Sequence, residues 1–147
     1  MFADTLPQPE ECNCLAVRQA ARHVTHFYDQ FLVTVGLRTT QFSILAKLQR
    51  LGPLSINALA AQLVMDRTTL GRTIQPLVRE GLVAIVPGIR DRRSKELHLT
   101  DAGAERLRAA VKQWIRAQDR FGEIFGIERT ADLRALLHLV SSAELQA

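Results

Sequence analysis

The feature that most constrains the fold of this chain is a pair of short β-strand patterns in a sequence that is otherwise helical in its periodicity. Residues 82–86, LVAIV, are apolar and mostly β-branched, and residues 95–99, KELHL, alternate with Leu97 and Leu99 on one side. The segment between them, PGIRDRRS, contains Gly, Pro and three arginines. We expect the two strands to pair as a hairpin with a basic tip.

Helical periodicity accounts for most of the remaining chain. Apolar residues recur at three- and four-residue steps over residues 14–32, 40–51, 56–63 and 67–80, and again after Thr100 and after Thr130. Ser55, Asp66, Thr100 and Thr130 are predicted as N-caps, and Gly81 as the residue that ends the helix over 67–80. Pro76 lies inside that helix and predicts a kink.

Two short helices joined by a tight turn and followed by a hairpin make a winged helix-turn-helix. We therefore predict a mainly α fold with a small β-hairpin wing, formed by one domain over residues 14–147. Residues 1–13 contain two prolines and no periodicity, and are predicted to be a flexible N-terminal arm. The helix-turn-helix lobe spans about 38–99. The outer segments, about 14–35 and 100–147, have broad apolar faces that one small lobe cannot cover, which predicts a homodimer.

Positive charge is concentrated in one fifth of the chain. The formal net charge is +4, and residues 66–95 carry all of this excess. Such clustering is an electrostatic footprint for phosphate, and the second helix of a helix-turn-helix enters the DNA major groove. With its leucines facing inward, the helix over 67–80 presents Arg67, Thr68, Thr69, Arg72 and Thr73. The wing adds Arg90, Asp91, Arg92, Arg93 and Lys95, and we expect Asp91 to pair with the Arg93 guanidinium and fix its direction. The predicted partner is double-stranded DNA.

The stretch from Leu37 to Gly103 resembles the core of the MarR (multiple antibiotic resistance regulator) family. Its most specific parts are LVREGLV, at the end of the recognition helix, and DRRSKELHLTDAG, which joins the wing to the dimerisation helix. The resemblance covers about residues 14–145. It implies a dimeric winged-helix transcription factor, commonly a repressor, that binds pseudo-palindromic DNA and is released by a small ligand or by thiol oxidation. It also places Arg93 in the minor groove, with Asp91 as the residue that orients it.

The resemblance implies two alternative switches. Some relatives sense hydroperoxides through a cysteine at the start of the first helix, a position that corresponds to Cys14, and Tyr28 matches a tyrosine that hydrogen-bonds this cysteine. Arg18, one helical turn after Cys14, would stabilise its thiolate, and Cys12 could act as a resolving partner, across the dimer rather than toward Cys14.

The other switch is a small aromatic or carboxylate effector. The family binds such effectors between the dimerisation helices and the DNA-binding lobe. Arg18, His23, His26 and Arg38 are the residues expected to line that site.

Other classes of protein are less well supported by the sequence. No apolar run approaches the ~20 residues of a membrane span, and the acidic N-terminus lacks the apolar core of a secretory signal, which predicts a cytoplasmic protein. There is no Gly-rich phosphate loop, HExxH motif or Cys/His cluster with zinc spacing, so no enzyme activity, metal or cofactor is predicted. Two alternatives stay open: a thiol peroxidase that uses Cys14, and a winged-helix adaptor that binds protein and not DNA and tolerates the loss of Arg93 and Arg72.

Overall fold

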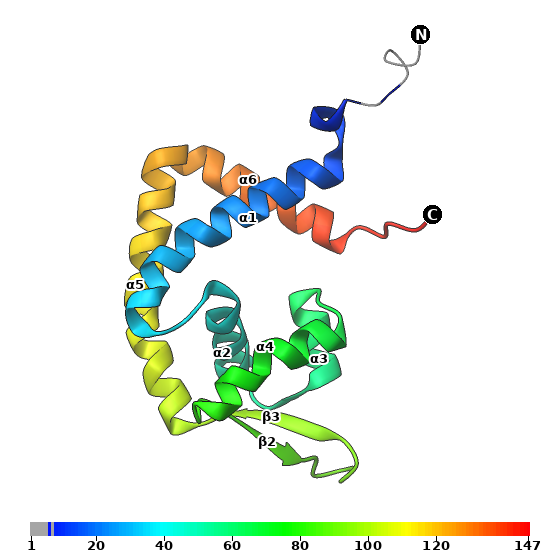
Figure 1. Ribbon diagram of the computed structural model, residues 1–147, viewed down its shortest axis with the longest axis vertical. Coiled ribbons are helices and arrows are strands. Elements are labelled where there is room, and N and C mark those ends of the chain that lie inside the picture. Colours follow the sequence, from blue (N-terminus) through cyan, green and yellow to red (C-terminus); the bar gives the residue numbers. More distant parts are fainter. Residues whose placement is uncertain (1–5, 7) are drawn as a thin grey trace.

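The chain forms a mainly helical winged helix-turn-helix flanked by long helices, as the sequence predicts. The structure is a computed structural model and describes residue 6 and residues 8–147. Its lobe contains α2 (Thr39–Leu51), β1 (Leu54–Ser55), α3 (Ile56–Leu63), α4 (Arg67–Arg79), β2 (Val83–Pro87) and β3 (Lys95–Leu99). Figure 1 shows α5 (Asp101–Phe125) running from this lobe to the opposite end, where α1 (Asn13–Leu32) and α6 (Ile127–Ser142) lie.

The predicted N-terminal arm falls partly outside the described residues, which exclude residues 1–5 and 7. Within the described part, Pro9–Glu11 form a 3-10 helix and α1 already begins at Asn13. The flexibility of the arm and the domain limits stay predictions.

Three of the four predicted N-caps are confirmed. The Ser55 hydroxyl accepts a hydrogen bond from the Ala58 N–H at 3.1 Å, and the Asp66 carboxylate accepts one from the Thr69 N–H at 2.8 Å. Thr100 accepts from the Gly103 N–H at 3.0 Å. Each cap satisfies an N–H group that the first helical turn leaves without a partner.

The cap predicted at Thr130 is wrong. The sixth helix begins at Ile127, directly after Gly126, which takes φ 104° and ψ 133° and acts as the N-cap. Thr130 lies one turn inside the helix, where its hydroxyl donates to the Gly126 carbonyl at 2.7 Å. A glycine can turn the chain within a single residue, so no separate loop is needed between α5 and α6.

Residues with a positive φ flank α4 on both sides. Gly81 takes φ 74° just after the helix, as predicted for its C-terminal glycine, and α4 continues through Pro76 up to Arg79. At the turn before α4, Val64 takes φ 52° and ψ 48°, and no other non-glycine residue of the described chain has a positive φ. A β-branched side chain is strained in this left-handed region, and Val64 is also 75% exposed.

The wing is rooted in a three-stranded sheet rather than in a hairpin alone. The strand order is β1-β3-β2, with both pairs antiparallel, so that β3 is central. Leu97 faces Leu54 on one side and Ile85 on the other and is completely buried. The first strand was not expected from the sequence. It joins the base of the wing to the residues that lead into α3.

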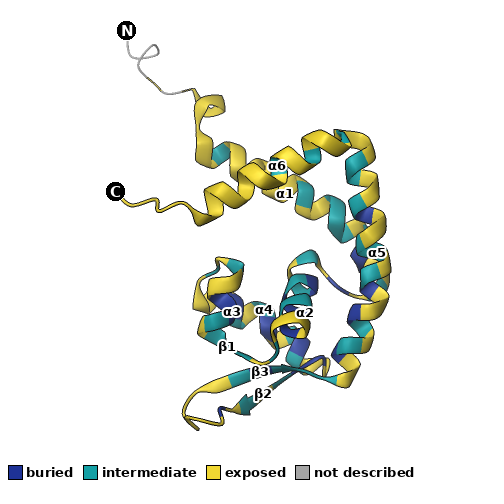
Figure 2. Cartoon of the chain, turned by 180° about the vertical axis from the view of Figure 1, so that it is seen from behind, coloured by how far each residue is buried: buried dark blue, intermediate teal, exposed yellow. Residues whose placement is uncertain are grey.

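Burial is concentrated in the lobe and in the adjoining half of α5. The core contains Leu45, Leu59, Leu70, Ile74, Leu77, Leu97 and Leu107, among others. In α1 only Leu32 is buried, and α6 has no buried residue. Figure 2 accordingly shows both helices as mostly exposed, although Leu136 and Leu139 on α6 are large apolar residues. None of the helices in the described ranges is long and apolar enough to cross a membrane.

Candidate nucleic-acid interface

The outer face of α4 is polar and is set by the burial of its inner face. Leu70, Ile74 and Leu77 are buried in the lobe. This orientation leaves four of the predicted contact residues exposed and Thr73 half-buried; the exposed ones are Arg67, Thr68, Thr69 and Arg72. The predicted set on this helix therefore lies on one accessible surface.

The three threonines of this face differ in their free hydrogen-bonding groups. Thr69 donates its hydroxyl proton to the Asp66 carboxylate at 2.6 Å, and Thr73 donates to the Thr69 carbonyl at 3.0 Å. The Asp66 carboxylate accepts from the Thr69 hydroxyl and from the Thr69 N–H, and these two bonds, the hydroxyl's first, lower the pKa of Asp66. Of these three threonines, only Thr68 has a hydroxyl that makes no hydrogen bond within the described chain, so on this face it is the threonine donor that a ligand can use.

The tip of the wing is a tight turn held by its own backbone. The Ser94 N–H donates to the Asp91 carbonyl at 3.0 Å, and the Gly88 N–H donates to the Ser94 carbonyl at 2.7 Å. A Cβ on Gly88 would lie 2.5 Å from the Ser94 hydroxyl oxygen and 2.8 Å from the Asp91 carbonyl oxygen. The strands can therefore close in this way only around a glycine. The turn projects Arg92 and Arg93 from its two central positions.

The expected pairing of Asp91 with the Arg93 guanidinium is wrong for this chain. The Asp91 carboxylate instead accepts a hydrogen bond from the backbone N–H of Arg93 at 3.0 Å. This is an Asx turn, in which a carboxylate binds the backbone two residues further on. Asp91 thus orients Arg93 through the main chain, and the guanidinium stays available to a ligand.

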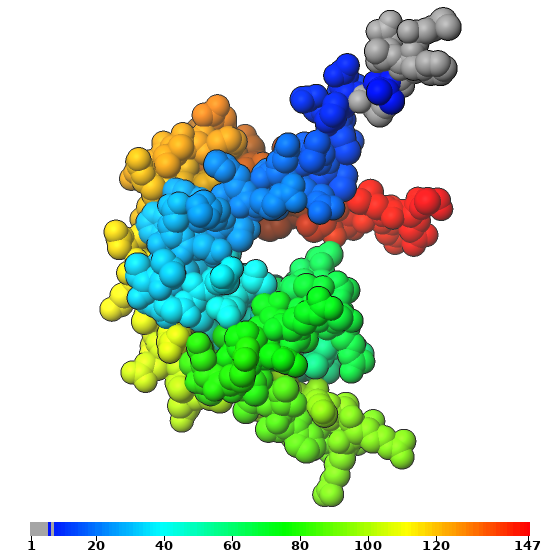
Figure 3. Space-filling model, viewed as in Figure 1, coloured from blue at the N-terminus to red at the C-terminus, as the bar shows by residue number. Residues whose placement is uncertain are grey.

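A hollow of about 440 Å³ brings the wing and both helices of the motif together. It is lined by Ser55, Ile56, Asn57, Arg67, Asp91, Arg93, Ser94 and Lys95. Three cations thus face one carboxylate beside the N-terminal end of α3, whose free N–H groups also favour an anion. Figure 3 shows the wing projecting beyond the rest of the molecule from the lobe. The hollow lies between the tip turn of the wing and the N-terminal ends of α3 and α4.

The sequence prediction included the cations of this hollow but missed the start of α3. Arg72, Arg90 and Arg92 do not line the hollow, although all three are exposed. Ser55, Ile56 and Asn57 belong to the hollow because β1 pairs with β3 and holds the start of α3 beside the wing. The predicted cap at Ser55 correctly marks the start of α3. The position of that start beside the wing could not be predicted, because it depends on the pairing of β1 with β3.

Of the candidate redox residues, the two cysteines stand together at the start of α1, whereas Tyr28 lies far from them within one chain. Cys12 is the N-cap of α1, where its Sγ accepts from the Leu15 N–H at 3.3 Å, and both Cys12 and Cys14 are exposed free thiols. Tyr28 lies about 21 Å further along the same helix, at 1.5 Å per residue, and cannot reach Cys14 of its own chain. Its hydroxyl donates to Gln118 on α5, and burial raises its pKa, which Arg134 partly offsets. A contact between Tyr28 and Cys14 requires a second copy.

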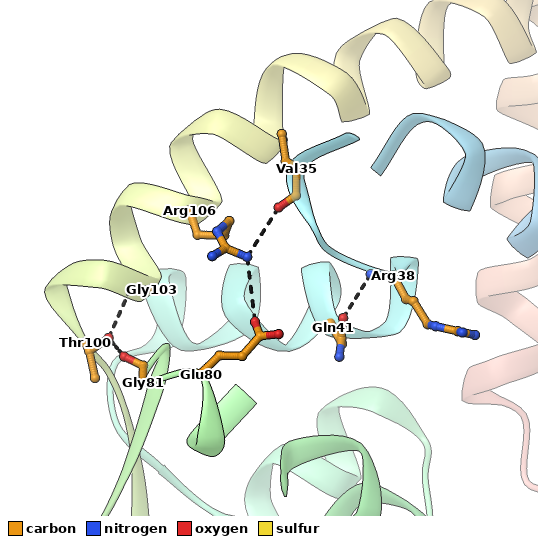
Figure 4. A network of polar contacts seen from close by, with 8 residues as sticks. All are labelled: Val35, Arg38, Gln41, Glu80, Gly81, Thr100, Gly103 and Arg106. Atoms are coloured by element: carbon orange, nitrogen blue, oxygen red, sulfur yellow. Dashed lines mark hydrogen bonds and ion pairs between the residues drawn. The ribbon is translucent and has the colours of Figure 1, made fainter. Parts of the chain in front are cut away.

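The residues predicted to bind an effector are exposed and do not share the hollow near them. Arg18, His23 and His26 lie on α1, and Arg38 precedes α2. A hollow of about 340 Å³ between α1, α5 and α6 is mostly apolar and is lined by none of the four. Figure 4 shows the Arg38 side chain directed away from the neighbouring polar contacts. In the described chain no group of three or more His, Cys, Asp or Glu side chains is placed to hold a metal ion.

The helix-turn-helix, the small sheet and the basic wing define the class of this molecule as a winged helix-turn-helix protein. The model of the MarR family matches residues 37–95, which contain this whole lobe up to the start of β3. Over nearly its full length the chain is also similar to transcriptional regulator MosR of M. tuberculosis, solved in complex with DNA. The two share 34% identity with a TM-score of 0.77, over 92% of this chain and 100% of the other. The chain belongs to the MarR family of transcriptional regulators.

Two further relatives extend this comparison. The chain is 34% identical over 106 residues to the transcriptional activatory protein BadR of Rhodopseudomonas palustris. That match covers 70% of this chain and 59% of BadR, so the chain spans little more than half the length of this relative. The transcriptional repressor CouR, bound to a 23-mer DNA duplex, shares 26% identity and a TM-score of 0.80, over 93% of this chain and 99% of the other.

Proposed function

We propose that this protein is a homodimeric transcriptional regulator that binds pseudo-palindromic double-stranded DNA through α4 and the wing. The observation that carries the proposal is the hollow between the tip of the wing and the start of α3, which is lined by Arg67, Arg93 and Lys95. A backbone phosphate matches the charge and size of Arg67 and Lys95 beside the N-terminus of α3, and Arg93 is assigned to the adjacent minor groove. The likeness to MosR and CouR, both solved with DNA, supports the same use of the surface.

Each part of the surface has a distinct role in this proposal. The N-terminal half of α4 enters the major groove, where Arg72 can bind a guanine edge through two hydrogen bonds and Thr68 can donate to a base or phosphate. The wing follows the adjacent minor groove and inserts Arg93, which is attracted by the negative potential of A·T-rich DNA. Arg90 and Arg92 contact phosphates, which fix orientation and add affinity but carry no sequence information.

The dimer is proposed from the apolar surface that one chain leaves uncovered. Ile127 is 80% exposed and Leu139 66% exposed on α6, a helix that buries none of its residues. A helix of this length is marginal in water unless one face is packed, and a second copy supplies that packing. Two-fold symmetry then places two α4 helices on half-sites one turn of DNA apart, about 34 Å.

Selection of bound sequences from a random DNA pool tests this function. We expect an enriched site with two-fold symmetry; a purified protein that enriches no sequence at low salt would overturn the proposal. Titration of Arg93→Ala at several salt concentrations then tests the wing. The slope of log K against log[salt] should become shallower by up to about 1.8, because a dimer loses two Arg93 side chains. Each contributes ~0.9 if it displaces one counterion.

Arg108→Ala is the matched control for this titration. Arg108 is an exposed arginine of α5 that makes no hydrogen bond or ion pair within the described chain and does not line the hollow at the wing. It is expected to leave the slope nearly unchanged. If Arg93→Ala and Arg72→Ala instead both behave like this control, the protein-binding adaptor becomes the better reading.

Relatives of this chain regulate in both directions, since BadR is an activatory protein and CouR a repressor. Repression stays the prediction for this chain, because binding over a promoter excludes polymerase without any further contact. A reporter gene placed behind the selected site should fall in expression when the protein is supplied, and a rise would assign activation. A cytoplasmic location likewise stays a prediction.

For release we propose thiol oxidation at Cys14. Both cysteines are exposed, and Tyr28 can approach Cys14 only from a second copy. The Cys14 thiolate attacks the peroxide oxygen, so that an S–O bond forms, the O–O bond breaks and an alcohol leaves. The sulfenic acid then condenses with the Cys12 thiol of the partner subunit to give a disulfide and water. This disulfide would move the N-terminal end of α1 in each subunit, which would change the arrangement of the dimer and lower its affinity for DNA.

The test compares wild type with Cys14→Ser before and after organic hydroperoxide. The variant should bind the selected site normally and stay bound after treatment, whereas the wild type is released. A wild type that ignores hydroperoxide removes this switch. Repeated turnover of peroxide with a dithiol reductant, without loss of DNA binding, would instead support the thiol peroxidase alternative.

The small-effector switch is tested on the same complex. Aromatic carboxylates are titrated against the bound DNA with wild type and with Arg38→Ala. Release that is lost in the variant would support the predicted site around Arg18, His23, His26 and Arg38. Release that is retained would exclude Arg38 from it.

A further inference from the structure

One face of α5 contacts the residues that follow the C-terminal end of the recognition helix α4. Thr100 caps α5, and Gly103 and Arg106 follow at three-residue steps, which places all three on the same side of the helix. Figure 4 shows the Thr100 and Arg106 side chains directed toward the segment just after α4, which contains Glu80 and Gly81. The dimerisation helix and the recognition helix therefore meet at this face.

The first two of these residues hold the backbone after α4. The Thr100 hydroxyl donates to the Gly81 carbonyl at 2.6 Å, and the Thr100 N–H donates to the Leu82 carbonyl at 3.1 Å. A Cβ on Gly103 would lie 2.1 Å from the Leu82 carbonyl oxygen. The two backbones approach as closely as a glycine allows. The end of α4 cannot shift along α5 without breaking these contacts.

Arg106 adds a third element to this junction. Its Nη1 donates to the Val35 carbonyl at 3.3 Å and lies 3.7 Å from the Glu80 carboxylate. Val35 ends the 3-10 helix that follows α1, and a Cβ on the neighbouring Gly36 would lie 3.1 Å from the same Nη1. One guanidinium nitrogen of α5 thus contacts both the 3-10 helix that follows α1 and the C-cap residue of α4.

The end of α1 is also fixed to the rest of the lobe. The Asp29 carboxylate accepts from both the N–H and the hydroxyl of Thr39, each at 2.7 Å. A displacement of α1 therefore reaches the connection that carries Val35, and from there it reaches Arg106. An arginine suits this place because its planar group can donate in two directions at once.

We propose that Arg106 is a positioning residue that fixes the recognition helix relative to the dimerisation helices α1 and α5. In a dimer this contact sets the separation and relative rotation of the two α4 helices, and so determines which half-site spacing the protein accepts. The proposal rests on the proposed function, since it requires a dimer bound to two half-sites.

The test is spacing discrimination rather than affinity alone. Gel-shift titrations use the selected DNA site and versions with one base pair added or removed at its centre. Each base pair moves one half-site by about 3.4 Å and rotates it by about 34°. Wild type should prefer the original spacing by roughly tenfold or more, whereas Arg106→Met should prefer it by less than about threefold.

Arg108→Met is the matched control, because it removes the same charge from the same helix without touching the junction. It should keep the wild-type preference. A variant that is only less stable lowers the active fraction and weakens binding to all three sites equally, so its ratio of affinities is unchanged. Two milder variants provide the same test if Arg106→Met does not fold. Arg106→Lys keeps the charge beside Glu80 and should recover part of the preference, and Glu80→Gln should lose part of it.

The outcomes separate the two proposals. If wild type binds no selected site, the proposed function fails. If wild type discriminates between spacings and Arg106→Met discriminates equally well, the proposed function stands and the role of Arg106 is refuted. If Arg106→Met does not fold, an unchanged preference in both Arg106→Lys and Glu80→Gln refutes it as well.

Discussion

Replacing Gly103 with alanine should strongly destabilise the protein, because α5 crosses the end of α4 without room for a methyl group. The added Cβ would lie 2.1 Å from the Leu82 carbonyl oxygen and 2.7 Å from Leu99 Cδ1. The Leu99 side chain can rotate away, but the carbonyl belongs to the backbone and accepts the Thr100 N–H. The helix must therefore move by about an ångström, since Cβ contacts shorter than 3.0 Å essentially do not occur.

The expected loss combines three effects. Overpacking costs up to about 3 kcal/mol, and loss of the backbone hydrogen bond from Thr100 costs about 1 kcal/mol. Alanine returns up to about 1 kcal/mol of helix propensity, which leaves a net destabilisation of roughly 3 kcal/mol. For a chain of this length that lowers the melting temperature by about 6 to 12 °C.

Thermal unfolding followed by circular dichroism measures this loss, at one fixed protein concentration because the stability of a dimer depends on it. Gly71→Ala is the control. It adds the same methyl group in α4, where nothing lies within 4 Å of the new Cβ, and should raise stability by about 0.5 to 1 kcal/mol. A Gly103→Ala protein that melts at or above the wild-type temperature would refute the close approach of α5 to the end of α4.

Three further changes follow from local features of the lobe. Val64→Gly should stabilise the protein by about 1 kcal/mol in urea denaturation, because it relieves a left-handed valine that is mostly exposed; no gain would mean that the strain is absent. The folded-state pKa of Asp66 lies below its unfolded value of about 3.9, so its stabilising effect is present above that pH and is lost as the pH falls through the folded-state pKa. Asp66→Ala should therefore be less stable than wild type at pH 7, and the difference should shrink below about pH 4; a difference independent of pH would contradict the role of the charge. Gly88→Ala pushes on Ser94 at the wing, so DNA binding should weaken about tenfold while the melting temperature stays within about 2 °C, and intact binding would show that the tip tolerates a different shape.

The sequence predicted the elements whose signals are local. The caps at Ser55, Asp66 and Thr100 depend on a side chain and an N–H three residues later, so a local pattern indicates them, although the same pattern failed at Thr130, where Gly126 begins the helix earlier. The end of the segment DRRSKELHLTDAG is explained by the same contacts, with Thr100 as the cap and Gly103 as the point of close approach. The inward leucines of α4 likewise follow from helical spacing.

Features that depend on partners distant in the sequence were missed or misassigned. The strand at Leu54 and Ser55 has only two residues and no periodicity, and it exists because β3, some forty residues later, offers it an edge. The direction of the Asp91 bond could not be predicted, since its carboxylate reaches both a backbone N–H and a guanidinium from the same position. The grouping of Arg18 with Arg38 in one effector site stays a prediction, because it depends on how α1 packs against the lobe, which no pattern within either segment contains.

The tip of the wing is closed entirely by bonds among residues 88 to 94, and none of these bonds reaches the hydrophobic interior. The conformation of this loop therefore depends on its own residues and not on the packing of the core. Its other residues can be substituted without destabilising the lobe, provided that Gly88 and Asp91 are kept. The exposed side chains of the tip can therefore change without altering the packing of the lobe.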